Sequence, residues 1–331
     1  MLEAVDGRLK IASGELTVEN TTFCGAKCIM CPRDEFEQVR HWQHMSFDTF
    51  QNVIDQAVPL GMKSLDLCGF GDPLMDPHLR QKLEYVKSHY PQVSIYTSTT
   101  AHLLHKKNLD WVCANFNTLK ISNYGFSKES YEKVHAGVVK FEKVWENVHN
   151  LLAIPRGQRP HVIMSFLVFP ENEHEIEVWK AYWGTRADEI MVWLPHNYGG
   201  SDTIEEVAYM TSARMANSEP RSCGRPFKGN PFIRANGDVS VCCYDFNHKL
   251  VVGNLNKTSL ADILGGEQLA GVQSVHKKKN FKGCGLLCEG CDQIFDRKDA
   301  LMFASNKSRS VDQPTTHPEH IVKLVEEASV F

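Results

Sequence analysis

Long apolar runs are absent from this 331-residue sequence, and no window approaches the roughly 18 apolar residues that a membrane-spanning helix needs. The first residues, MLEAVDGRLKIASGE, are mixed and polar, which excludes the apolar core of a secretory signal peptide. Basic runs interleaved with aromatic residues are also missing, and 36 Lys and Arg against 40 Asp and Glu give a net charge of −4. Internal repeats and low-complexity segments are lacking too. We therefore expect a soluble, cytoplasmic protein that binds neither membranes nor nucleic acid.

Cysteine, by contrast, is plentiful. The composition is otherwise that of an ordinary globular protein, 42% hydrophobic and 23% charged, long enough for one large domain plus a smaller one. Of the eleven cysteines, three stand at positions 24, 28 and 31 and three at 284, 288 and 291. A disulfide framework rarely bunches in this way, whereas clustered cysteines in a reducing compartment indicate metal binding.

The first two thirds of the chain alternate short apolar runs with helical patterns. The strand-like runs fall at 15–19, 64–70, 92–99, 118–124, 161–169 and 189–195. Ser46 is predicted to cap the first long helix, which ends near Gly61. Six β–α alternations predict a parallel sheet with right-handed crossovers. Because a closed barrel has eight units, we expect an α/β fold with a partial (β/α)6 TIM-like barrel over residues 1–200.

The second part of the chain is predicted to form a small cysteine-rich domain. A polar, turn-rich connecting segment spans 201–222. The domain itself covers 223–300, with a β-hairpin around Asn236-Gly237 and a helix after it. Residues 301–331 are expected to form a polar tail and a C-terminal helix.

Three cysteines stand close together in the segment CGAKCIMC, at Cys24, Cys28 and Cys31. A structural zinc site or a fully ligated iron–sulfur cluster takes four protein ligands. Three thiolates can instead hold three corners of a cubane cluster and leave the fourth iron open to a non-protein ligand. The loop follows the first strand, at the end of a parallel sheet where active-site loops lie. The spacing alone leaves open a zinc site completed by a distant cysteine or histidine.

A second loop, LCGFGDPLMDP, follows the second strand, and in a parallel sheet it neighbours the cysteine loop. Gly69 and Gly71 let the backbone approach a ligand closely, and Asp72 places a carboxylate at the mouth of the sheet. The same pattern also fits an ordinary turn before a helix. Cys68, at the end of the strand, is either a small buried residue or a candidate hydrogen-atom donor to the substrate.

The spacing Cys24-x3-Cys28-x2-Cys31, the GFGDP loop, MSFDTF at 45–50 and the β/α pattern together resemble the radical S-adenosylmethionine (radical SAM) superfamily. The resemblance implies that the three cysteines bind a [4Fe-4S] cluster and that S-adenosylmethionine chelates the fourth iron. An electron from the cluster then cleaves S-adenosylmethionine to a 5′-deoxyadenosyl radical, which abstracts hydrogen from the substrate. It also implies flavodoxin or ferredoxin as the electron donor.

The resemblance assigns Asp72, with the backbone of Gly69 and Gly71, to the methionyl ammonium of S-adenosylmethionine. Two residues depart from the family pattern: Met30 stands where an aromatic residue is usual, and Asp72 where Glu is common. Neither change removes a needed chemical group. Four residues after the third and fourth strands are candidates for the ribose or the carboxylate: Ser98, Thr100, Ser122 and Asn123. Loop capping explains these hydroxyls and amides equally well.

A second set of cysteines lies in the small domain, where four thiolates can form a cage. The four candidate ligands are Cys223, Cys242, Cys288 and Cys291. Physical reasoning allows either zinc or an iron–sulfur cluster here. The spacing resembles the SPASM/Twitch extension of radical SAM enzymes, which binds auxiliary [4Fe-4S] clusters. No cysteine follows Cys291, which argues for one auxiliary cluster; whether Cys243 or Cys284 replaces one of the four ligands stays open.

Two clusters of this kind predict an oxidation. A fully ligated auxiliary cluster cannot bind substrate but can carry an electron, so loss of a hydrogen atom, a hydroxyl proton and one electron sums to a two-electron oxidation. The single auxiliary cluster resembles that of aminocyclitol (2-deoxy-scyllo-inosamine) dehydrogenases. We therefore expect a dehydrogenase-like oxidoreductase whose substrate is a sugar, cyclitol or related alcohol. Candidate acceptors of the hydroxyl proton are Arg33, His196, Asn197 and Tyr198.

Two other functions remain open from the sequence. One is that of a maturase or epimerase acting on a ribosomally made peptide, with a separate peptide-recognition chain. Only 23 residues precede Cys24, fewer than an added recognition domain needs, which lowers this alternative. The other is a non-catalytic iron–sulfur or zinc-binding protein, such as an electron carrier. The Asp72 loop and an open iron speak against it, because a carrier has no use for either.

Overall fold

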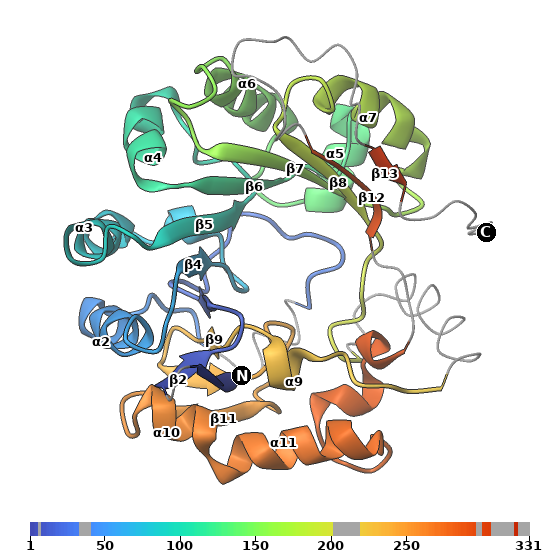
Figure 1. The fold of residues 1–331 in the computed structure, drawn as a ribbon. Helices are drawn as coiled ribbons and strands as arrows, with labels where there is room; N and C mark the ends of the chain where they lie inside the picture. The colour runs from blue at the N-terminus through green and yellow to red at the C-terminus, as the bar shows by residue number, and fades with distance from the viewer. Residues whose placement is uncertain (6–7, 33–40, 201–218, 296–299, 306–320, 324–331) are drawn as a thin grey trace. The chain divides into compact units, whose positions relative to one another are not determined.

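The structure is a computed structural model, drawn in Figure 1, and two compact units are distinguished in it. The described residues are 1–5, 8–32, 41–200, 219–295, 300–305 and 321–323. Unit 1 comprises Met1–Cys24, Pro32–Ile95 and His196–Arg297, and unit 2 comprises Gly25–Cys31, Tyr96–Pro195 and Lys298–Phe331. Most of the expected connecting segment, residues 201–218, lies outside the described residues. The predicted domain boundaries therefore stay a prediction.

Unit 1 contains a sheet with the strand order β11-β10-β9-β3-β4 and a separate hairpin, β1-β2. Its strands are β1 (Leu2–Val5), β2 (Arg8–Ile11), β3 (Glu15–Val18), β4 (Ser64–Leu67), β9 (Phe232–Ile233), β10 (Asp238–Ser240) and β11 (Val251–Asn254). Its helices are α2 (Phe47–Ala57), η1 (Pro73–Met75), α3 (Leu79–His89), α9 (Arg225–Lys228), α10 (Leu260–Gly265), α11 (Glu267–Lys278), η4 (Leu287–Gly290) and η5 (Asp292–Ile294). β3 pairs in parallel with both β4 and β9, so the hairpin β9-β10 extends the sheet that leads into the cysteine loop.

Unit 2 contains a parallel sheet, β5-β6-β7-β8, with two antiparallel strands added at β8. Its strands are β5 (Ser94–Thr99, which starts in unit 1), β6 (Thr118–Ser122), β7 (His161–Leu167), β8 (Glu189–Trp193), β12 (Ala300–Ser305) and β13 (Ile321–Lys323). Its helices are η2 (Lys106–Asn108), α4 (Leu109–Asn115), α5 (Lys128–His135), α6 (Phe141–Leu152), η3 (Glu173–Glu175) and α7 (Ile176–Trp183). Helices α4 to α7 flank these strands in Figure 1.

The α/β class and the six strands expected between residues 15 and 197 are confirmed, as β3 to β8. Within the described residues neither sheet closes on itself, as six units rather than eight predict. Ser46 caps α2 by accepting a hydrogen bond from the Thr49 amide, at 3.1 Å. The hairpin turn is also as expected, with Gly237 at a φ of +85°, a region that glycine adopts readily.

The C-terminal segment differs from the expectation of a tail and a helix. Residues 300–305 form β12, which pairs with β8, and Ile321–Lys323 form β13 instead of starting a helix. β8 would otherwise be an edge strand with unpaired backbone groups, and β12 satisfies them. The β-branched residues Ile321 and Val322 also favour a strand. Residues 306–320 and 324–331 lie outside the described residues.

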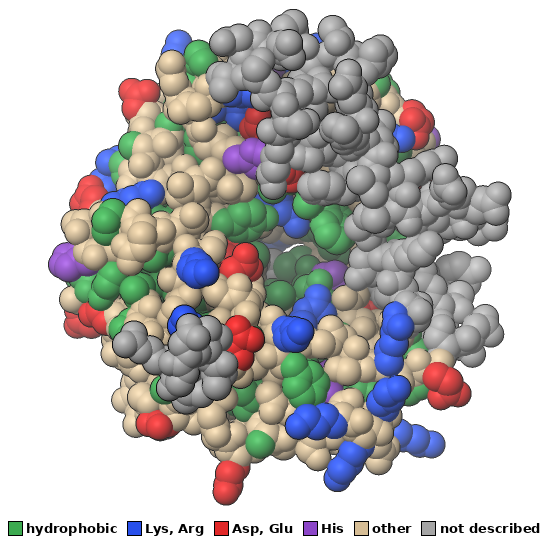
Figure 2. All heavy atoms as spheres, in the orientation of Figure 1, with side chains coloured by type: hydrophobic (Ala, Val, Ile, Leu, Met, Phe, Trp, Pro, Cys, Tyr) green, Lys and Arg blue, Asp and Glu red, His purple; other side chains and the backbone are tan. Residues whose placement is uncertain are grey.

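The surface carries charges of both signs. Figure 2 shows acidic and basic side chains scattered over one face, with Lys and Arg gathered where α11 ends in Figure 1. Lys277, Lys278 and Lys279 are exposed at that end of the helix. Among the helices that the structure describes, none combines the length and the apolar character that crossing a membrane requires.

A buried ion pair joins Asp76 to Lys82 just beyond the glycine loop (residues 69–72). The Lys82 Nζ lies 2.6 Å from Asp76 Oδ2, and both side chains are fully buried. The same carboxylate oxygen accepts a hydrogen bond from Asn20 Nδ2 at 3.0 Å, and Lys82 also donates to the Met45 carbonyl. One carboxylate thus connects α3 to the segment that precedes the cysteine loop.

Replacing Lys82 by Met is expected to lower the free energy of unfolding by about 3 kcal/mol, because Asp76 would remain as a buried, uncompensated charge. The matched control is Lys128→Met at the exposed Lys128–Glu142 pair, whose side chains are 60% and 62% exposed. We expect that change to leave the free energy of unfolding nearly unchanged, because solvent screens an exposed pair. Urea unfolding of the two variants measures both values, and equal losses would contradict the interpretation.

Candidate functional site

The glycine loop packs directly against the segment that leads into Cys24. The Asp72 amide donates to the Phe23 carbonyl at 2.8 Å. A Cβ atom on Gly71 would collide with the Thr21 carbonyl oxygen, and one on Gly69 would lie 2.5 Å from Glu19 Cγ. Side chains at positions 69 and 71 would therefore push the two segments apart. As the strand order predicts, the glycine loop lies beside the start of the cysteine loop.

The substitution Gly71→Ala is expected to destabilise the protein by about 3 kcal/mol, because the new methyl group meets backbone atoms that cannot move aside. The control is Gly271→Ala in α11, where an added Cβ meets nothing within 4 Å. That change is expected to be neutral or stabilising by about 0.5 kcal/mol, since Ala favours a helix over Gly. Thermal unfolding compares the two, and a Gly71→Ala protein as stable as the parent would contradict the predicted clash.

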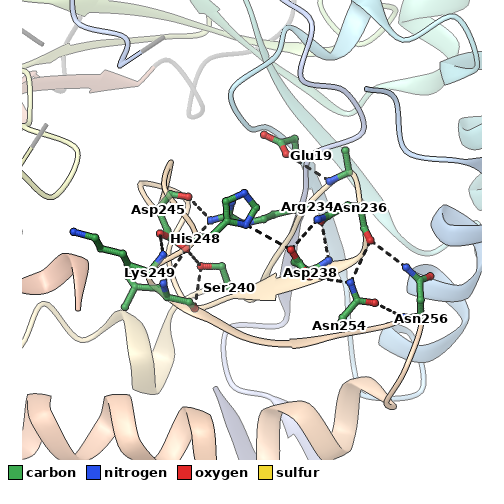
Figure 3. A network of polar contacts seen from close by, with 12 residues as sticks. Glu19, Arg234, Asn236, Asp238, Ser240, Asp245, His248, Lys249, Asn254 and Asn256 are labelled. Carbon is green, nitrogen blue, oxygen red and sulfur yellow. Dashed lines mark hydrogen bonds and ion pairs between the residues drawn. The ribbon is translucent and has the colours of Figure 1, made fainter. Parts of the chain in front are cut away.

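Glu19, at the end of β3, is a site residue that the sequence pattern did not single out. Its side chain is buried, with the residue 1% exposed. One carboxylate oxygen accepts from the Phe70 amide at 3.0 Å and the other from the Ala235 amide at 3.5 Å. Figure 3 shows Glu19 pointing at the turn of the β9-β10 hairpin. One carboxylate thus joins the glycine loop to the hairpin. In the sequence, Glu19 is marked only as an acidic residue shortly before the cysteine loop.

Asp72 is held in place by its own backbone environment. The residue is 3% exposed, and its Oδ1 accepts a hydrogen bond from the Leu74 amide at 3.1 Å, which caps the short helix η1. This bond fixes the orientation of the carboxylate at the end of β4. Its role toward the methionyl ammonium stays a prediction.

The cysteine loop runs from Cys24, the last residue of the first segment of unit 1, to Cys28 and Cys31 in unit 2. All three cysteines are half-buried. The Cys31 amide donates to the Cys28 carbonyl at 2.9 Å, and the amides of Lys27 and Ile29 donate to the carbonyls of His135 and Val134. The segment around Cys28 is thereby held against the end of α5, and Cys28 Sγ lies 3.4 Å from His135 Nδ1.

Three of the four polar residues expected to meet the cofactor near the ends of β5 and β6 have partners within the protein. The Asn123 side-chain oxygen accepts the indole N–H of Trp179 at 2.7 Å, and Ser122 Oγ accepts from the Tyr124 hydroxyl at 3.0 Å. Thr100 Oγ1 lies 2.8 Å from His102 Nδ1, and Ser98 is half-buried on β5. Such contacts are what the loop-capping alternative expects, and the cofactor roles stay predictions. Arg33 lies outside the described residues.

The four predicted auxiliary cysteines all lie in unit 1, and two of them, Cys242 and Cys223, are close enough to affect the ionisation of the other two. They are Cys223 before α9, Cys242 after β10, Cys288 in η4 and Cys291 after η4. Burial raises the pKa of the Cys288 and Cys291 thiols, and the charges of Cys242 and Cys223 raise both further. Thiolates in such a place need a compensating cation, which iron supplies. The donor set therefore fits a four-thiolate cluster.

Cys243 and Cys284, whose role as ligands the sequence left open, lie in different surroundings. Cys284 acts on Cys288 more weakly than the other cysteines do, as the last of its electrostatic neighbours. Cys243 has Cys68 and Asp66 among its electrostatic neighbours. Cys68, whose amide donates to the Val18 carbonyl, follows β4 directly before the glycine loop. These positions favour Cys242 over Cys243 as the ligand, and the assignment stays a prediction.

Backbone amides donate to two of the four sulfur atoms, and a histidine ring nitrogen lies beside a third. The amides of Tyr244 and Gln293 donate to Cys242 Sγ and Cys291 Sγ, each at 3.4 Å. The third sulfur, that of Cys288, lies 3.3 Å from His276 Nε2. Donors to sulfur suit the thiolates of an iron–sulfur cluster. Within the described part of the chain, no three Cys, His, Asp or Glu side chains meet as closely as a single metal ion requires; a cubane spaces its ligands more widely than one ion does.

A buried ion pair fixes the loop that carries Cys242. Arg234 and Asp245 face each other in Figure 3, 2.6 Å apart and both fully buried. Asp245 Oδ2 also accepts from Ser240 Oγ at 3.0 Å and from the Leu250 amide at 3.1 Å. Cys242 lies between Ser240 and Asp245 in the chain, so this network holds the strand end from which its sulfur projects.

A row of aromatic rings connects the glycine loop with the cysteine-bearing loop after β10. The ring of His196 stacks on Tyr244, with centroids 3.7 Å apart, and lies 4.3 Å from Tyr198. Tyr198 in turn lies 6.1 Å from Phe70 of the glycine loop. The guanidinium of Arg225 lies 4.5 Å from the Tyr244 ring. Two of the predicted substrate residues, His196 and Tyr198, are therefore placed between the two loops.

Asn197 holds this segment against the CxxC region. Its amide donates to Asp292 Oδ2 at 3.1 Å, and its Nδ2 donates to the Gly290 carbonyl at 2.8 Å. The Asp292 amide donates back to Asn197 Oδ1 at 3.1 Å. These three hydrogen bonds explain why His196 and Tyr198 are fixed on either side of it. Asn197 therefore has a structural part in the site, and its side chain is engaged by the protein.

Two family models match this chain, and the residues that they match include the loops just described. The model of the radical SAM superfamily matches residues 18–180, and the model described as SPASM, an iron–sulfur cluster-binding domain, matches residues 223–292. The chain carries a radical SAM domain and a SPASM domain. The radical SAM domain binds a [4Fe-4S] cluster and S-adenosylmethionine, and the SPASM domain binds auxiliary iron–sulfur. The cofactors predicted from the sequence are therefore confirmed.

Solved structures share this fold, and a curated relative matches about half of the sequence. The crystal structure of BtrN in complex with AdoMet and 2-DOIA is 18% identical with a TM-score of 0.60, covering 84% of this chain and 92% of that one. Streptococcus suis SuiB bound to precursor peptide SuiA is 14% identical with a TM-score of 0.63, covering 86% and 71%. The GTP 3′,8-cyclase of Desulforamulus reducens is 22% identical over 161 residues, which is 48% of each chain, so the match spans about half of the cyclase.

Proposed function

We propose that this radical SAM protein oxidises an alcohol group of a polar small molecule, a sugar, cyclitol or related compound, to a carbonyl group. The observation that carries the proposal is the placement of His196 and Tyr198 between the glycine loop and the Cys242 loop. A substrate that contacts these rings lies near the glycine loop, which is predicted to bind S-adenosylmethionine. It also lies near the predicted auxiliary cluster, which can accept an electron. The likeness to BtrN, solved with AdoMet and 2-DOIA, supports the same class of substrate.

The reaction needs three particles to leave the alcohol: a hydrogen atom, a proton and an electron. When bound, S-adenosylmethionine and the two clusters supply the removal of the hydrogen atom and the acceptance of the electron. The chain itself must accept the hydroxyl proton, and His196 is the group we assign to it, because a neutral imidazole has one ring nitrogen without a hydrogen, which can accept a proton. The rings of Tyr198 and Tyr244 both pack against the imidazole ring. Flavodoxin or ferredoxin is the proposed electron donor, in a cytoplasm that keeps cysteines reduced.

The test is a substrate panel under anaerobic conditions. Reconstituted protein is mixed with dithionite, S-adenosylmethionine and, in turn, 2-deoxy-scyllo-inosamine, an inositol and a hexose. We expect one of them to give a ketone two mass units lighter, together with an equal amount of 5′-deoxyadenosine. His196→Gln is expected to lower the rate of ketone formation at least tenfold and to leave slow 5′-deoxyadenosine formation in place. Ketone formation at the parent rate in that variant would remove His196 from the proposal.

Peptide modification is the second candidate, and the similarity to SuiB with its bound precursor peptide favours it. The same assay with short peptides encoded near the gene separates the two functions. Modification of a peptide, with all three alcohols left unchanged, would replace the small-molecule proposal by this one.

A further inference from the structure

Two buried histidines outside the predicted site each place a ring nitrogen on the sulfur of a predicted cluster cysteine. His135, the last residue of α5, is 0% exposed, and its Nδ1 lies 3.4 Å from Cys28 Sγ. His276, on α11, is 1% exposed, and its Nε2 lies 3.3 Å from Cys288 Sγ. The two contacts lie in different units, one at each cluster.

The hydrogen of His135 can be placed from its second contact. The Tyr124 amide donates to His135 Nε2 at 3.2 Å, and a backbone amide can only donate. A neutral imidazole carries one hydrogen, which must then be on Nδ1, pointing at Cys28 Sγ. The ring is also stacked on Tyr124, 4.8 Å between centroids and 9° between planes, and lies 4.3 Å from Tyr131.

The hydrogen of His276 follows from a similar relay. The Gly224 amide donates to Ser222 Oγ at 3.1 Å, and that oxygen lies 3.1 Å from His276 Nδ1. A cysteine bound to iron is a thiolate without a hydrogen, so Nε2 must be the donor toward Cys288. Nδ1 then accepts the Ser222 hydroxyl hydrogen. Ser222 and His276 each donate one hydrogen bond and accept one in this relay, and Ser222 stands next to Cys223 in the chain.

We propose that His135 and His276 are positioning residues that each donate an N–H···S hydrogen bond to one cluster thiolate, Cys28 and Cys288 respectively, and thereby raise the reduction potential of that cluster. A donor at sulfur stabilises the extra negative charge that a cluster gains on reduction, and hydrogen bonds to the sulfurs are one of the levers on such potentials. The proposal rests on the ligand assignments made above for the two clusters.

The test is an EPR-monitored redox titration of protein carrying both clusters. The two signals are told apart because S-adenosylmethionine changes only the spectrum of the cluster with the open iron. In His135→Leu we expect that cluster to accept an electron about tenfold less readily, a shift of about 59 mV to more negative potential. The auxiliary cluster keeps its potential. In His276→Leu the auxiliary cluster shifts by a similar amount, and the other does not.

Conservative variants distinguish the effect of losing the hydrogen bond from the effect of changing the packing. His135→Asn offers an amide nitrogen where Nδ1 lies, and His276→Gln offers one where Nε2 lies. We expect each amide variant to recover at least half of the shift, and Ser222→Ala to lower the potential of the auxiliary cluster alone. Unchanged potentials in both Leu variants with full iron content would overturn the proposal. Equal shifts in the Leu and amide variants would do so as well.

A measurement on the parent protein covers the case in which variants fail to fold. Pulsed EPR on protein labelled with 15N-histidine is expected to show one coupled nitrogen at each reduced cluster, and absence of that coupling would also overturn the proposal. Iron analysis tests the ligand assignment independently of the proposed hydrogen bonds. If Cys28→Ala or Cys288→Ala retains the full iron content, the assignment fails; if iron is lost but the histidine variants keep their potentials, only the hydrogen bonds fail.

Discussion

The Cys28→Ala protein is expected to form no 5′-deoxyadenosine and to hold about four irons per chain instead of about eight. Three cysteines are the fewest that can hold a cubane and still leave one iron for S-adenosylmethionine. Cys28 is the middle one, and its segment is held to the end of α5 by two backbone hydrogen bonds. Losing it removes both a ligand and the sulfur that faces His135. Iron analysis and chromatography of the products after reduction with dithionite measure the two losses.

The matched control for this variant is Cys113→Ala. Cys113 also lies in unit 2, on α4, and is half-buried. Burial raises the pKa of its thiol, as expected for a packing residue rather than a ligand. We expect the control to keep its iron and its 5′-deoxyadenosine formation. If Cys28→Ala retained both, the cluster would not be held by the CGAKCIMC loop.

The Cys288→Ala protein is expected to lose about four irons, to keep forming 5′-deoxyadenosine and to form no oxidised product. The reason is that the two clusters have separate tasks in the proposed reaction. The auxiliary cluster serves only to take the last electron from the substrate, so its loss leaves the S-adenosylmethionine chemistry in place. Cys288 is buried, with Cys291, Cys242 and Cys223 as electrostatic neighbours, so another residue does not readily replace it.

The comparison for this second variant is Cys284→Ala. Cys284 stands four residues before Cys288 in the chain, and its thiol is half-buried rather than buried. Because it is not among the four assigned ligands, we expect Cys284→Ala to keep about eight irons and to form the oxidised product. If it lost four irons while Cys288→Ala kept them, the ligand set would be Cys223, Cys242, Cys284 and Cys291.

The strands of the α/β part were predictable because their signal is local. Runs such as 118–124 and 161–169 combine β-branched and aromatic residues over strand length, and they appear as β6 and β7. The caps and turns were predictable for the same reason, as Ser46 and Gly237 illustrate. The strands β12 and β13 were not, because they are specified by an unpaired edge of β8 far away in the sequence.

The same distinction between local and long-range signals applies to the candidate site. Cysteine spacing and a glycine loop can be recognised from neighbouring residues, since ligands of one cluster loop are close in the chain. Glu19, His135 and His276 carry no such signal, because each acts on a partner at least 12 residues away. A lone buried histidine in a helix is usually a packing residue, and only its contact with a sulfur distinguishes these two.

The sequence by itself determined the cofactors: the spacing of Cys24, Cys28 and Cys31, the glycine loop and the later cysteines can be read along the chain, and both family models match where these motifs lie. The tertiary structure decided what surrounds them. Pairing of β9 with β3 brings the hairpin beside the glycine loop, and burial of His135 and His276 fixes which ring nitrogen faces sulfur. These contacts depend on long-range packing, which no spacing of residues along the chain encodes.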